Sequence, residues 1–207
     1  MYDQIYYINL DSRTDRLYKF QDEVIENLPS LKSKFKRVSA TDMTIHKLIG
    51  QRASGCSLSH LRVWRDIIKH DYSSAIIMED DLKLVVDEET FNFRIAQLYD
   101  RFPDFGVCNI AWRNMIPLTS MDDIFSMGGS IQTTSGYIIS NEYAKLMQSR
   151  LEASIDNLLK GEAYQDNAID IIWKEYQGTP KWLVMDRLGI QGESFSDIEC
   201  RPTDYGV

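Results

Sequence analysis

Residues 55–86 of the chain read GCSLSHLRVWRDIIKHDYSSAIIMEDDLKLVV. Across residues 57–69, apolar side chains recur at steps of three and four residues, which predicts an amphipathic helix that packs on a sheet. They are Leu58, Leu61, Trp64, Ile67 and Ile68. Residues 75–78 form an unbroken apolar run between polar residues, as is typical of an inner parallel strand. Glu79, Asp80 and Asp81 follow at once.

The acidic triplet ends the predicted strand. Because side chains alternate along a strand, Glu79 and Asp81 point to one side and Asp80 to the other. Ligands of open α/β sheets bind at the carboxyl ends of the strands. Adjacent carboxylates repel one another unless a cation neutralises them, and Mg²⁺ commonly takes one or two carboxylates together with substrate phosphates. The triplet therefore indicates a metal-bridged diphosphate, with a solvated acidic turn as the alternative.

Composition narrows the class of protein. The 207 residues are 43% hydrophobic and 26% charged, which is ordinary for one globular domain over residues 1–207. No apolar run exceeds five residues, so we expect no transmembrane segment. The amino terminus enters a strand directly, which predicts no signal peptide. Three widely spaced cysteines without a CxxC pair favour a reducing compartment and argue against a zinc site: Cys56, Cys108 and Cys200.

The net charge of the chain limits which kinds of partner it can bind. At −8, the chain offers no basic surface for the phosphates of nucleic acid, so we expect no nucleic-acid partner. A small anionic substrate is compatible with this charge if a cation bridges it.

The amino-terminal part predicts a strand, a turn and a helix. Residues 5–8 form the strand, and a helical apolar pattern then runs to Pro29. Arg13 and Arg16 fall in the first turn of that helix, where cations oppose the helix dipole, so they indicate a bound anion, with ordinary surface arginines as the alternative. A second strand over residues 35–38 would bring Asp42 to the same edge.

Asp42 has two interpretations, a hydrogen bond to a ribose or base and a helix cap. Residues 43–54 are polar and poorly patterned, which favours a loop around the pocket. Residues 111–127 show no sustained period and are interpreted as an acceptor-facing lid. In the strand predicted over 131–139, Gly136 allows close backbone approach.

A helix over residues 165–176 would place Asp166 and Asp170 on one face, four residues apart. Like charges at this spacing are unfavourable, so one of them is a candidate functional group, with a solvated pair as the alternative. The polar tail, residues 191–199, is expected to fold back over the site. The remaining predicted elements are a helix over 87–102, strands over 105–110 and 182–185, and a helix that begins after a Ser140 cap.

Three motifs in this order resemble glycosyltransferase family 25, which includes bacterial lipopolysaccharide galactosyltransferases and collagen β-galactosyltransferases. They are INLDSRTDR (8–16), GCSLSHLRVW continuing to IIMEDD (55–81), and GIQGESFSDI (189–198). The resemblance implies a GT-A type, Rossmann-like α/β fold: a single domain whose mixed, mostly parallel central sheet is flanked by helices.

The resemblance also implies an activity. The family moves a hexose, usually galactose or glucose, from a UDP-sugar to a hydroxyl of a glycan or protein acceptor, with Mn²⁺ (or Mg²⁺) and with inversion at the anomeric carbon. Two other functions are weighed against it. One is a non-catalytic nucleotide-sugar-binding protein of the same fold. The other is a metal-dependent phosphohydrolase, whose DxDxT motif is absent because no threonine follows the triplet.

Residue roles follow from the resemblance. Asp81 is the expected metal ligand, together with Glu79. Many GT-A enzymes add a late histidine, but the last histidine here is His70, so Asp197 is the candidate third ligand. Asp170 is preferred to Asp166 as the base that takes the acceptor proton. The expected donor-binding residues are Leu10, Asp11, Arg16, Ala40, Asp42, Ser59, His60, Glu79, Asp80, Thr134, Ser135 and Gly136.

For His60 a purely structural role is the alternative. The chain is compact for the family, and we expect neither the luminal signal nor the retention tail of the animal collagen-modifying relatives. We therefore expect a cytoplasmic enzyme of bacterial or virus-encoded type, which places a collagen acceptor in doubt. The oligomeric state is open, with a homodimer among the alternatives.

Overall fold

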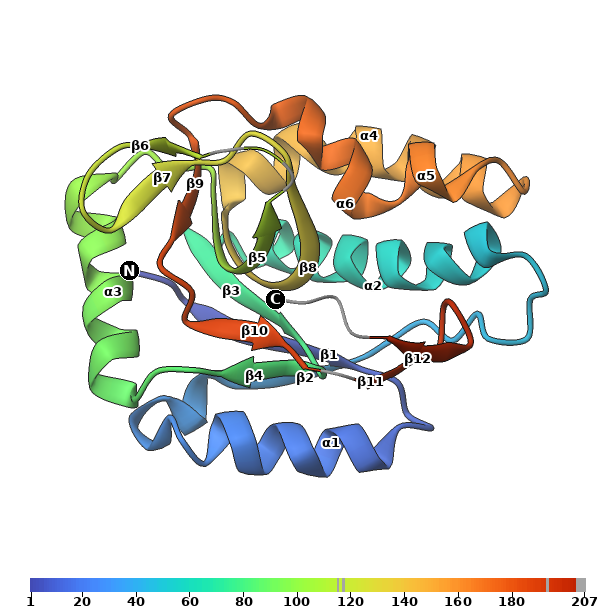
Figure 1. Cartoon of the computed structure of the whole chain (residues 1–207), viewed down its shortest axis with the longest axis horizontal. Helices are drawn as coiled ribbons and strands as arrows, with labels where there is room; N and C mark the ends of the chain where they lie inside the picture. The colour runs from blue at the N-terminus through green and yellow to red at the C-terminus, as the bar shows by residue number, and fades with distance from the viewer. Residues whose placement is uncertain (115, 117, 193, 204–207) are drawn as a thin grey trace.

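A central sheet of eight strands organises the molecule (Figure 1). The computed structural model describes residues 1–203 except 115, 117 and 193. In spatial order the strands are β2 (Phe35–Ser39), β1 (Gln4–Asn9), β3 (Ser74–Glu79), β8 (Ile131–Ser140), β5 (Val107–Asn114), β9 (Trp182–Met185), β7 (Phe125–Met127) and β6 (Thr119–Ser120). The pairings make β8 and β7 run opposite to the other six. The predicted mixed, mostly parallel sheet is confirmed.

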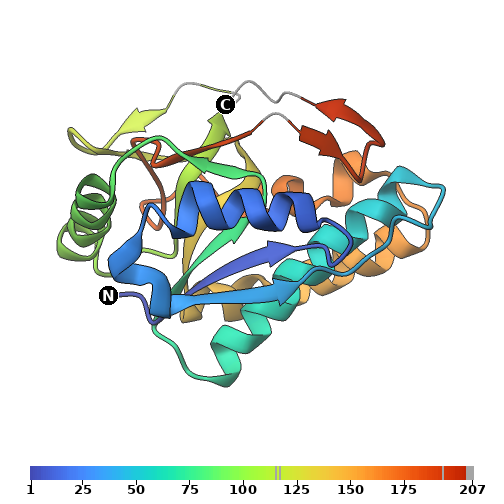
Figure 2. The same ribbon diagram turned by 90° about the horizontal axis from the view of Figure 1, so that it is seen from below.

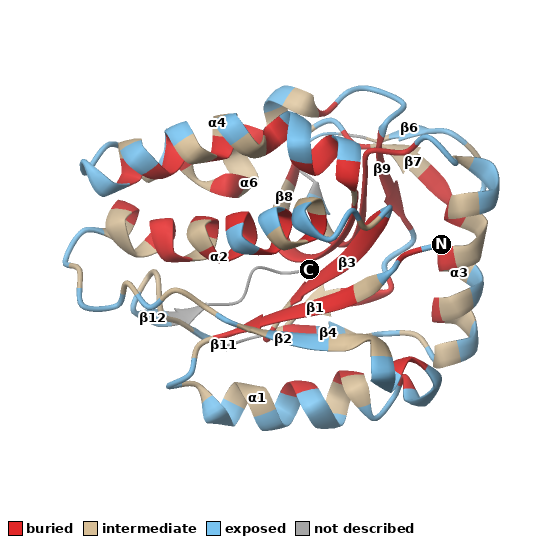
Figure 3. Ribbon diagram, turned by 180° about the vertical axis from the view of Figure 1, so that it is seen from behind, coloured by how far each residue is buried: buried red, intermediate tan, exposed pale blue. Residues whose placement is uncertain are grey.

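Helices cover both faces of the sheet (Figures 1 and 3). One face carries α1 (Thr14–Phe20), a π-helical turn (Gln21–Ile25) that extends it, a 3-10 helix (Pro29–Lys34) and α3 (Glu88–Arg101). The other carries α2 (Ile49–Lys69), α4 (Asn141–Leu159), α5 (Tyr164–Asn167), α6 (Ile169–Ile172) and the 3-10 helix Trp173–Tyr176.

Strand β3 shows how the two cores are divided. Ile76 and Met78 pack against α1 and α3, whereas Ala75 and Ile77 pack against α2 and α4, as strand alternation requires. The predicted apolar face of α2 is buried: Leu61, Trp64 and Ile67 are at most 3% exposed. The expectation of an inner parallel strand is only half correct, because β3 pairs parallel with β1 but antiparallel with β8.

Helix α2 begins earlier than predicted. Residues 43–54 were expected to form a loop, but the helix starts at Ile49. Its first turns pack through small residues, so they carry no large apolar pattern. A Cβ on Gly55 would lie 2.6 Å from the carbonyl oxygen of Thr41, and one on Gly50 would lie 3.0 Å from that of Glu162. Close backbone approach therefore replaces the apolar periodicity on which the prediction depended.

Two further predictions are wrong in detail. The helix expected over residues 165–176 is broken at Ala168, whose extended ψ of 148° separates α5 from α6. The lid expected over residues 111–127 instead continues β5 and then forms the β6–β7 edge of the main sheet, with residues 115 and 117 outside the described part. Both predictions used the pattern of side chains alone. That pattern shows neither a local break in the helical backbone nor which strands pair with each other.

Two small sheets complete the fold. Strand β4 (Leu82–Leu84) pairs with β10 (Gly189–Gln191), and β11 (Ser194–Ser196) pairs with β12 (Arg201–Thr203). Figure 2 shows the β11–β12 hairpin beside the start of α2. Within the described part of the chain, every helix is too short or too polar to cross a membrane.

Candidate functional site

The first cavity lies where the order of the parallel strands reverses. The chain pairs β2 on one side of β1 and β3 on the other, and such switch points are where open α/β sheets bind ligands. The cavity, here called the strand-end cavity, has a volume of about 150 Å³. Its wall comes from the end of β1, the segment after β2, the acidic triplet at the end of β3, the inner face of α2, and the tail.

A second, larger cavity adjoins the first. This α6 cavity has a volume of about 360 Å³ and is lined by residues of β8, α5 and α6. Four residues belong to the walls of both cavities: Cys56, Glu79, Gln191 and Ile198. The carboxylate of Glu79 therefore lies between the two cavities.

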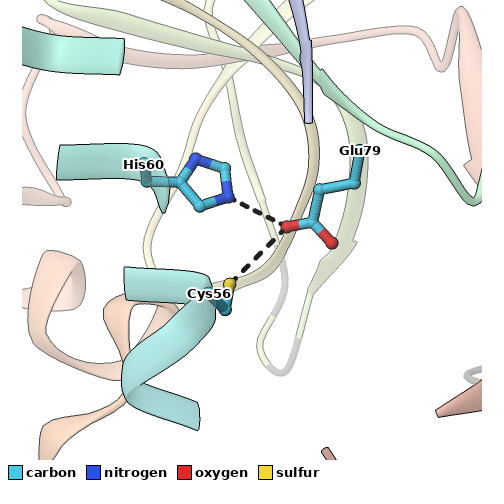
Figure 4. A group of neighbouring side chains, drawn as sticks. All are labelled: Cys56, His60 and Glu79. Atoms are coloured by element: carbon cyan, nitrogen blue, oxygen red, sulfur yellow. Dashed lines mark hydrogen bonds and ion pairs between the residues drawn. The ribbon is translucent and has the colours of Figure 1, made fainter. Parts of the chain in front are cut away.

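Glu79 is held by α2 and β8. Its Oε1 lies 3.0 Å from His60 Nε2 and 3.9 Å from Cys56 Sγ, and it also accepts a hydrogen bond from Thr134. Figure 4 shows His60 and Cys56 converging on this one oxygen while the second oxygen points away. Burial acts to raise the pKa of Glu79, but the hydrogen bonds from His60 and Thr134 and the positive charge of Arg16 act against it, and the pKa lies below its ordinary value.

The pKa of Asp81 is shifted in the opposite direction to that of Glu79. Its carboxylate accepts hydrogen bonds from Gln191 Nε2 at 2.9 Å and from Ser135 Oγ at 3.3 Å. Burial, and next the negative charge of Glu79, raise the pKa of Asp81 to about 7. The negative charges of Glu79 and Asp81 therefore repel each other, and their oxygen atoms are of the kind that hard divalent cations choose. This donor set fits Mn²⁺ or Mg²⁺.

The raised pKa of Asp81 makes a prediction about stability. An unfolded aspartate ionises near 3.8, whereas the folded one keeps its proton to about pH 7, so the metal-free protein loses stability as pH rises through that window. The Asp81→Asn variant removes this loss. We expect it to exceed the parent in free energy of unfolding by about 1–4 kcal/mol at pH 8, at roughly 1.36 kcal/mol per pKa unit, and to match it at pH 4. Urea unfolding in a chelator measures this, and an equal difference at both pH values would contradict it.

Asp80 faces the other way, as alternation predicts. It accepts hydrogen bonds from Asn9 Nδ2 at 2.6 Å and from Arg16 Nη1 at 2.9 Å. Burial raises the pKa of Asp80 above its ordinary value. Asp80 therefore ties the end of β3 to β1 and α1, and it places the Arg16 guanidinium in the wall of the strand-end cavity.

Asp170 lines the α6 cavity. Its Oδ2 lies 3.4 Å from the backbone nitrogen of Thr133, and burial raises the pKa of Asp170. Thr133 has a φ of 71°, which is rare for a β-branched residue and is characteristic of functional sites. Asp166, in contrast, is exposed on α5 and belongs to neither cavity wall among the described residues.

The tail folds back over the strand-end cavity, as predicted. Arg13 Nη1 lies 2.6 Å from Asp197 Oδ2, and Arg16 Nη2 lies 2.9 Å from the carbonyl oxygen of Phe195. Arg52 Nε, from α2, donates to the carbonyl oxygen of Ile198 at 2.6 Å. Three arginines thus hold the tail, and Asp197 is already neutralised by one of them.

The structure brings most of the predicted site residues together. Those in the wall of the strand-end cavity are Leu10, Arg16, Ala40, Ser59, His60, Glu79, Asp80, Asp81 and Asp197, and those in the α6 cavity are Glu79, Thr134 and Asp170. The predicted residues that the described cavity walls do not include are Asp11, Asp42, Ser135, Gly136 and Asp166.

These outlying residues have other contacts. Asp11 pairs with Arg37 at 2.7 Å and is 70% exposed, and Asp42 accepts a hydrogen bond from the backbone nitrogen of Thr44 at 2.9 Å. Ser135 is buried behind Asp81. A Cβ on Gly136 would lie 2.6 Å from Leu82 Cδ1, so Gly136 serves close packing of β8.

Several site residues were missed from the sequence. Asn9 is 1% exposed and hydrogen-bonded to Asp80, and its position at the carboxyl end of a strand is a signal that could have identified it. Cys56 lies one helical turn before His60, which is a second usable signal. Gln191 and Thr133 carry no local signal, because their positions depend on pairings between distant segments.

Known proteins resemble this chain in sequence and in fold. Residues 2–159 match the profile of glycosyltransferase family 25 (LPS biosynthesis protein). The chain is 27% identical over 175 residues to human procollagen galactosyltransferase 2, an alignment that covers 70% of this chain and 27% of that protein. The crystal structure of a glycosyltransferase involved in the glycosylation of the major capsid of PBCV-1 superposes with a TM-score of 0.56 at 11% identity, covering 95% of each chain.

Proposed function

The chain belongs to glycosyltransferase family 25, and we propose that it transfers a hexose, galactose or glucose, from a UDP-sugar to a hydroxyl of a glycan or protein acceptor. Its fold is of the GT-A type, as expected from the sequence. The matched human relative is a procollagen galactosyltransferase, but the chain spans only about a quarter of that protein's length. Donor, acceptor and activity are therefore proposals here.

One observation carries the proposal: the carboxylate of Glu79, the last residue of β3, lines two adjoining cavities, and Asp80 and Asp81 beside it line the first of them. A glycosyltransferase must hold a nucleoside diphosphate on one side of the transferred sugar and an acceptor on the other. We assign the nucleotide to the strand-end cavity, because it lies at the strand-order switch point. The sugar and acceptor then fall to the α6 cavity.

Glu79 and Asp81 are the proposed ligands of a Mn²⁺ or Mg²⁺ ion. The second oxygen of Glu79 makes no contact with His60 or Cys56, and Asp81 carries a raised pKa that a neighbouring cation would relieve. When bound, such an ion neutralises charge on the departing diphosphate. Asp197 is a weaker third ligand than expected, because it would first have to leave Arg13.

Asp170 is the proposed general base. It lines the α6 cavity that we assign to the acceptor, and burial raises its pKa, which makes its carboxylate a better proton acceptor than an ordinary aspartate. Inversion at the anomeric carbon follows if Asp170 activates the acceptor on the face of the sugar opposite the diphosphate. Arg16, at the strand-end cavity, is the proposed phosphate contact.

Ligand-induced stabilisation tests the donor class. With UDP and Mn²⁺ at about a hundred times the dissociation constant, the free energy of unfolding rises by roughly 2.7 kcal/mol, or about 5–10 °C in Tm for a chain of this size. UDP with a chelator is the control and should give a much smaller shift. A Tm that no nucleoside diphosphate raises in the presence of Mn²⁺ would contradict the proposal. A hydrolysis screen across UDP-galactose, UDP-glucose, UDP-N-acetylglucosamine and UDP-glucuronate then identifies the sugar.

A further inference from the structure

A chain of hydrogen bonds runs through the core to Glu79. Trp64 Nε1 lies 3.0 Å from the hydroxyl oxygen of Tyr137, that oxygen lies 2.8 Å from His60 Nδ1, and His60 Nε2 lies 3.0 Å from Glu79 Oε1. Trp64, Tyr137 and His60 are all 0% exposed. Trp64 and Tyr137 therefore act on the cavity only through His60.

The direction of each proton follows from what these groups can donate. The indole nitrogen of Trp64 is a donor only, so the Tyr137 oxygen accepts there. The hydroxyl proton of Tyr137 then needs an acceptor of its own. Among the described residues, the other hydrogen-bond partner of this hydroxyl is His60 Nδ1. Nδ1 is therefore the acceptor, and the ring proton of His60 is on Nε2, from which it is donated to Glu79.

We propose that Trp64 and Tyr137 are positioning residues that lock His60 in the Nε2–H tautomer, as a hydrogen-bond donor to Glu79. The lock occupies Oε1 of Glu79 and leaves the second oxygen for the cavity. The part of this inference that concerns donor binding depends on the proposed function, whereas the tautomer does not.

The same hydrogen-bond arrangement determines whether the Cys56, His60 and Glu79 cluster can bind a metal ion. One ligand atom from each lies within 4.8 Å of the others, a set of thiol, imidazole and carboxylate that would otherwise suit Zn²⁺ or Co²⁺. Coordination needs the lone pair of His60 Nε2, and freeing it would leave the Tyr137 proton without an acceptor inside the core. The parent protein therefore holds no thiolate-ligated ion there. Removing the Tyr137 hydroxyl removes this obstacle.

The tautomer is measured directly. In metal-free, donor-free protein labelled with ¹⁵N, long-range ¹H–¹⁵N correlation at pH 8 should show His60 as Nε2–H alone, assigned by its loss in His60→Gln. In Tyr137→Phe, we expect a mixture of tautomers or the Nδ1–H form. Tyr143→Phe is the matched control, because it also removes the hydroxyl of a buried tyrosine, and the hydrogen bonds of His60 are made to Tyr137 and Glu79 instead. It should leave the parent signal unchanged.

Metal binding supplies a second readout. In absorption spectra, added Co²⁺ should give no thiolate charge-transfer band with the parent protein. It should give this band with Tyr137→Phe, and the band should be absent again in the double variant Tyr137→Phe/Cys56→Ser. Mn²⁺-dependent UDP binding should weaken about 10–100-fold in Tyr137→Phe, the loss typical of an outer-shell partner.

An Nδ1–H signal in the parent, or a thiolate band in the parent, would overturn the inference. The NMR and Co²⁺ absorption spectra of the parent protein test the inference even if Tyr137→Phe fails to fold. Because they are recorded without donor, a failure here is distinct from a failure of UDP to bind.

Discussion

Asp170→Asn is expected to lower the rate of sugar transfer by about 10²–10⁴-fold, the usual contribution of a general base. The amide keeps the shape of the side chain but cannot take the proton of the acceptor hydroxyl. UDP and Mn²⁺ should still raise the Tm of the variant, because Asp170 lines the α6 cavity and not the strand-end cavity. Initial rates with the hexose donor and saturating acceptor measure the effect.

Asp166→Asn is the matched control for this experiment. Asp166 lies four residues away but is exposed and outside both described cavity walls, so its amide variant should turn over at the parent rate. Full activity in Asp170→Asn would place the base elsewhere. A parent that binds UDP yet transfers no sugar from any donor would instead favour the non-catalytic nucleotide-sugar-binding alternative.

Asp81→Asn is expected to abolish the rise in Tm that UDP causes in the presence of Mn²⁺. The change removes a charged ligand from the proposed ion, so the loss of affinity should exceed the roughly 10–100-fold that follows removal of outer-shell partners. Calorimetric titration of Mn²⁺ and UDP measures it. The same variant should be more stable than the parent without metal at pH 8, so weak binding cannot be attributed to unfolding.

Asp87→Asn supplies the control for Asp81→Asn. Asp87 caps α3 through a hydrogen bond to the backbone nitrogen of Thr90, and asparagine caps helices equally well. The variant loses a carboxylate of the same size away from the described cavity walls. Retained Mn²⁺-dependent UDP binding in Asp81→Asn, at the level of Asp87→Asn, would contradict the assignment of Asp81.

The sequence predicts the site best where the signal is local. A buried strand, alternation along it, and three carboxylates at its end are properties of adjacent residues, and the structure places Asp80 opposite Glu79 and Asp81 as expected. The apolar face of α2 is equally local. These two features alone place an acidic cluster where parallel strands end.

Other parts of the site depend on long-range pairing. Gln191 reaches Asp81 only because β10 pairs with β4, and Thr134 reaches Glu79 only because β8 inserts antiparallel beside β3. The sequence within a few residues of Gln191 or Thr134 does not predict these long-range pairings. The break at Ala168 was missed for a related reason, because the helical spacing of apolar residues continues across it while the backbone does not.

The central claim is that the carboxylates after β3 hold a divalent ion and, through it, a diphosphate. A crystal soaked with MnCl₂ and UDP tests it most directly by anomalous scattering from manganese. We predict one strong peak within coordination distance of Asp81 and Glu79 carboxylate oxygens, with both UDP phosphates beside it. A peak only elsewhere, or UDP bound in the strand-end cavity with no manganese at Asp81, would contradict it.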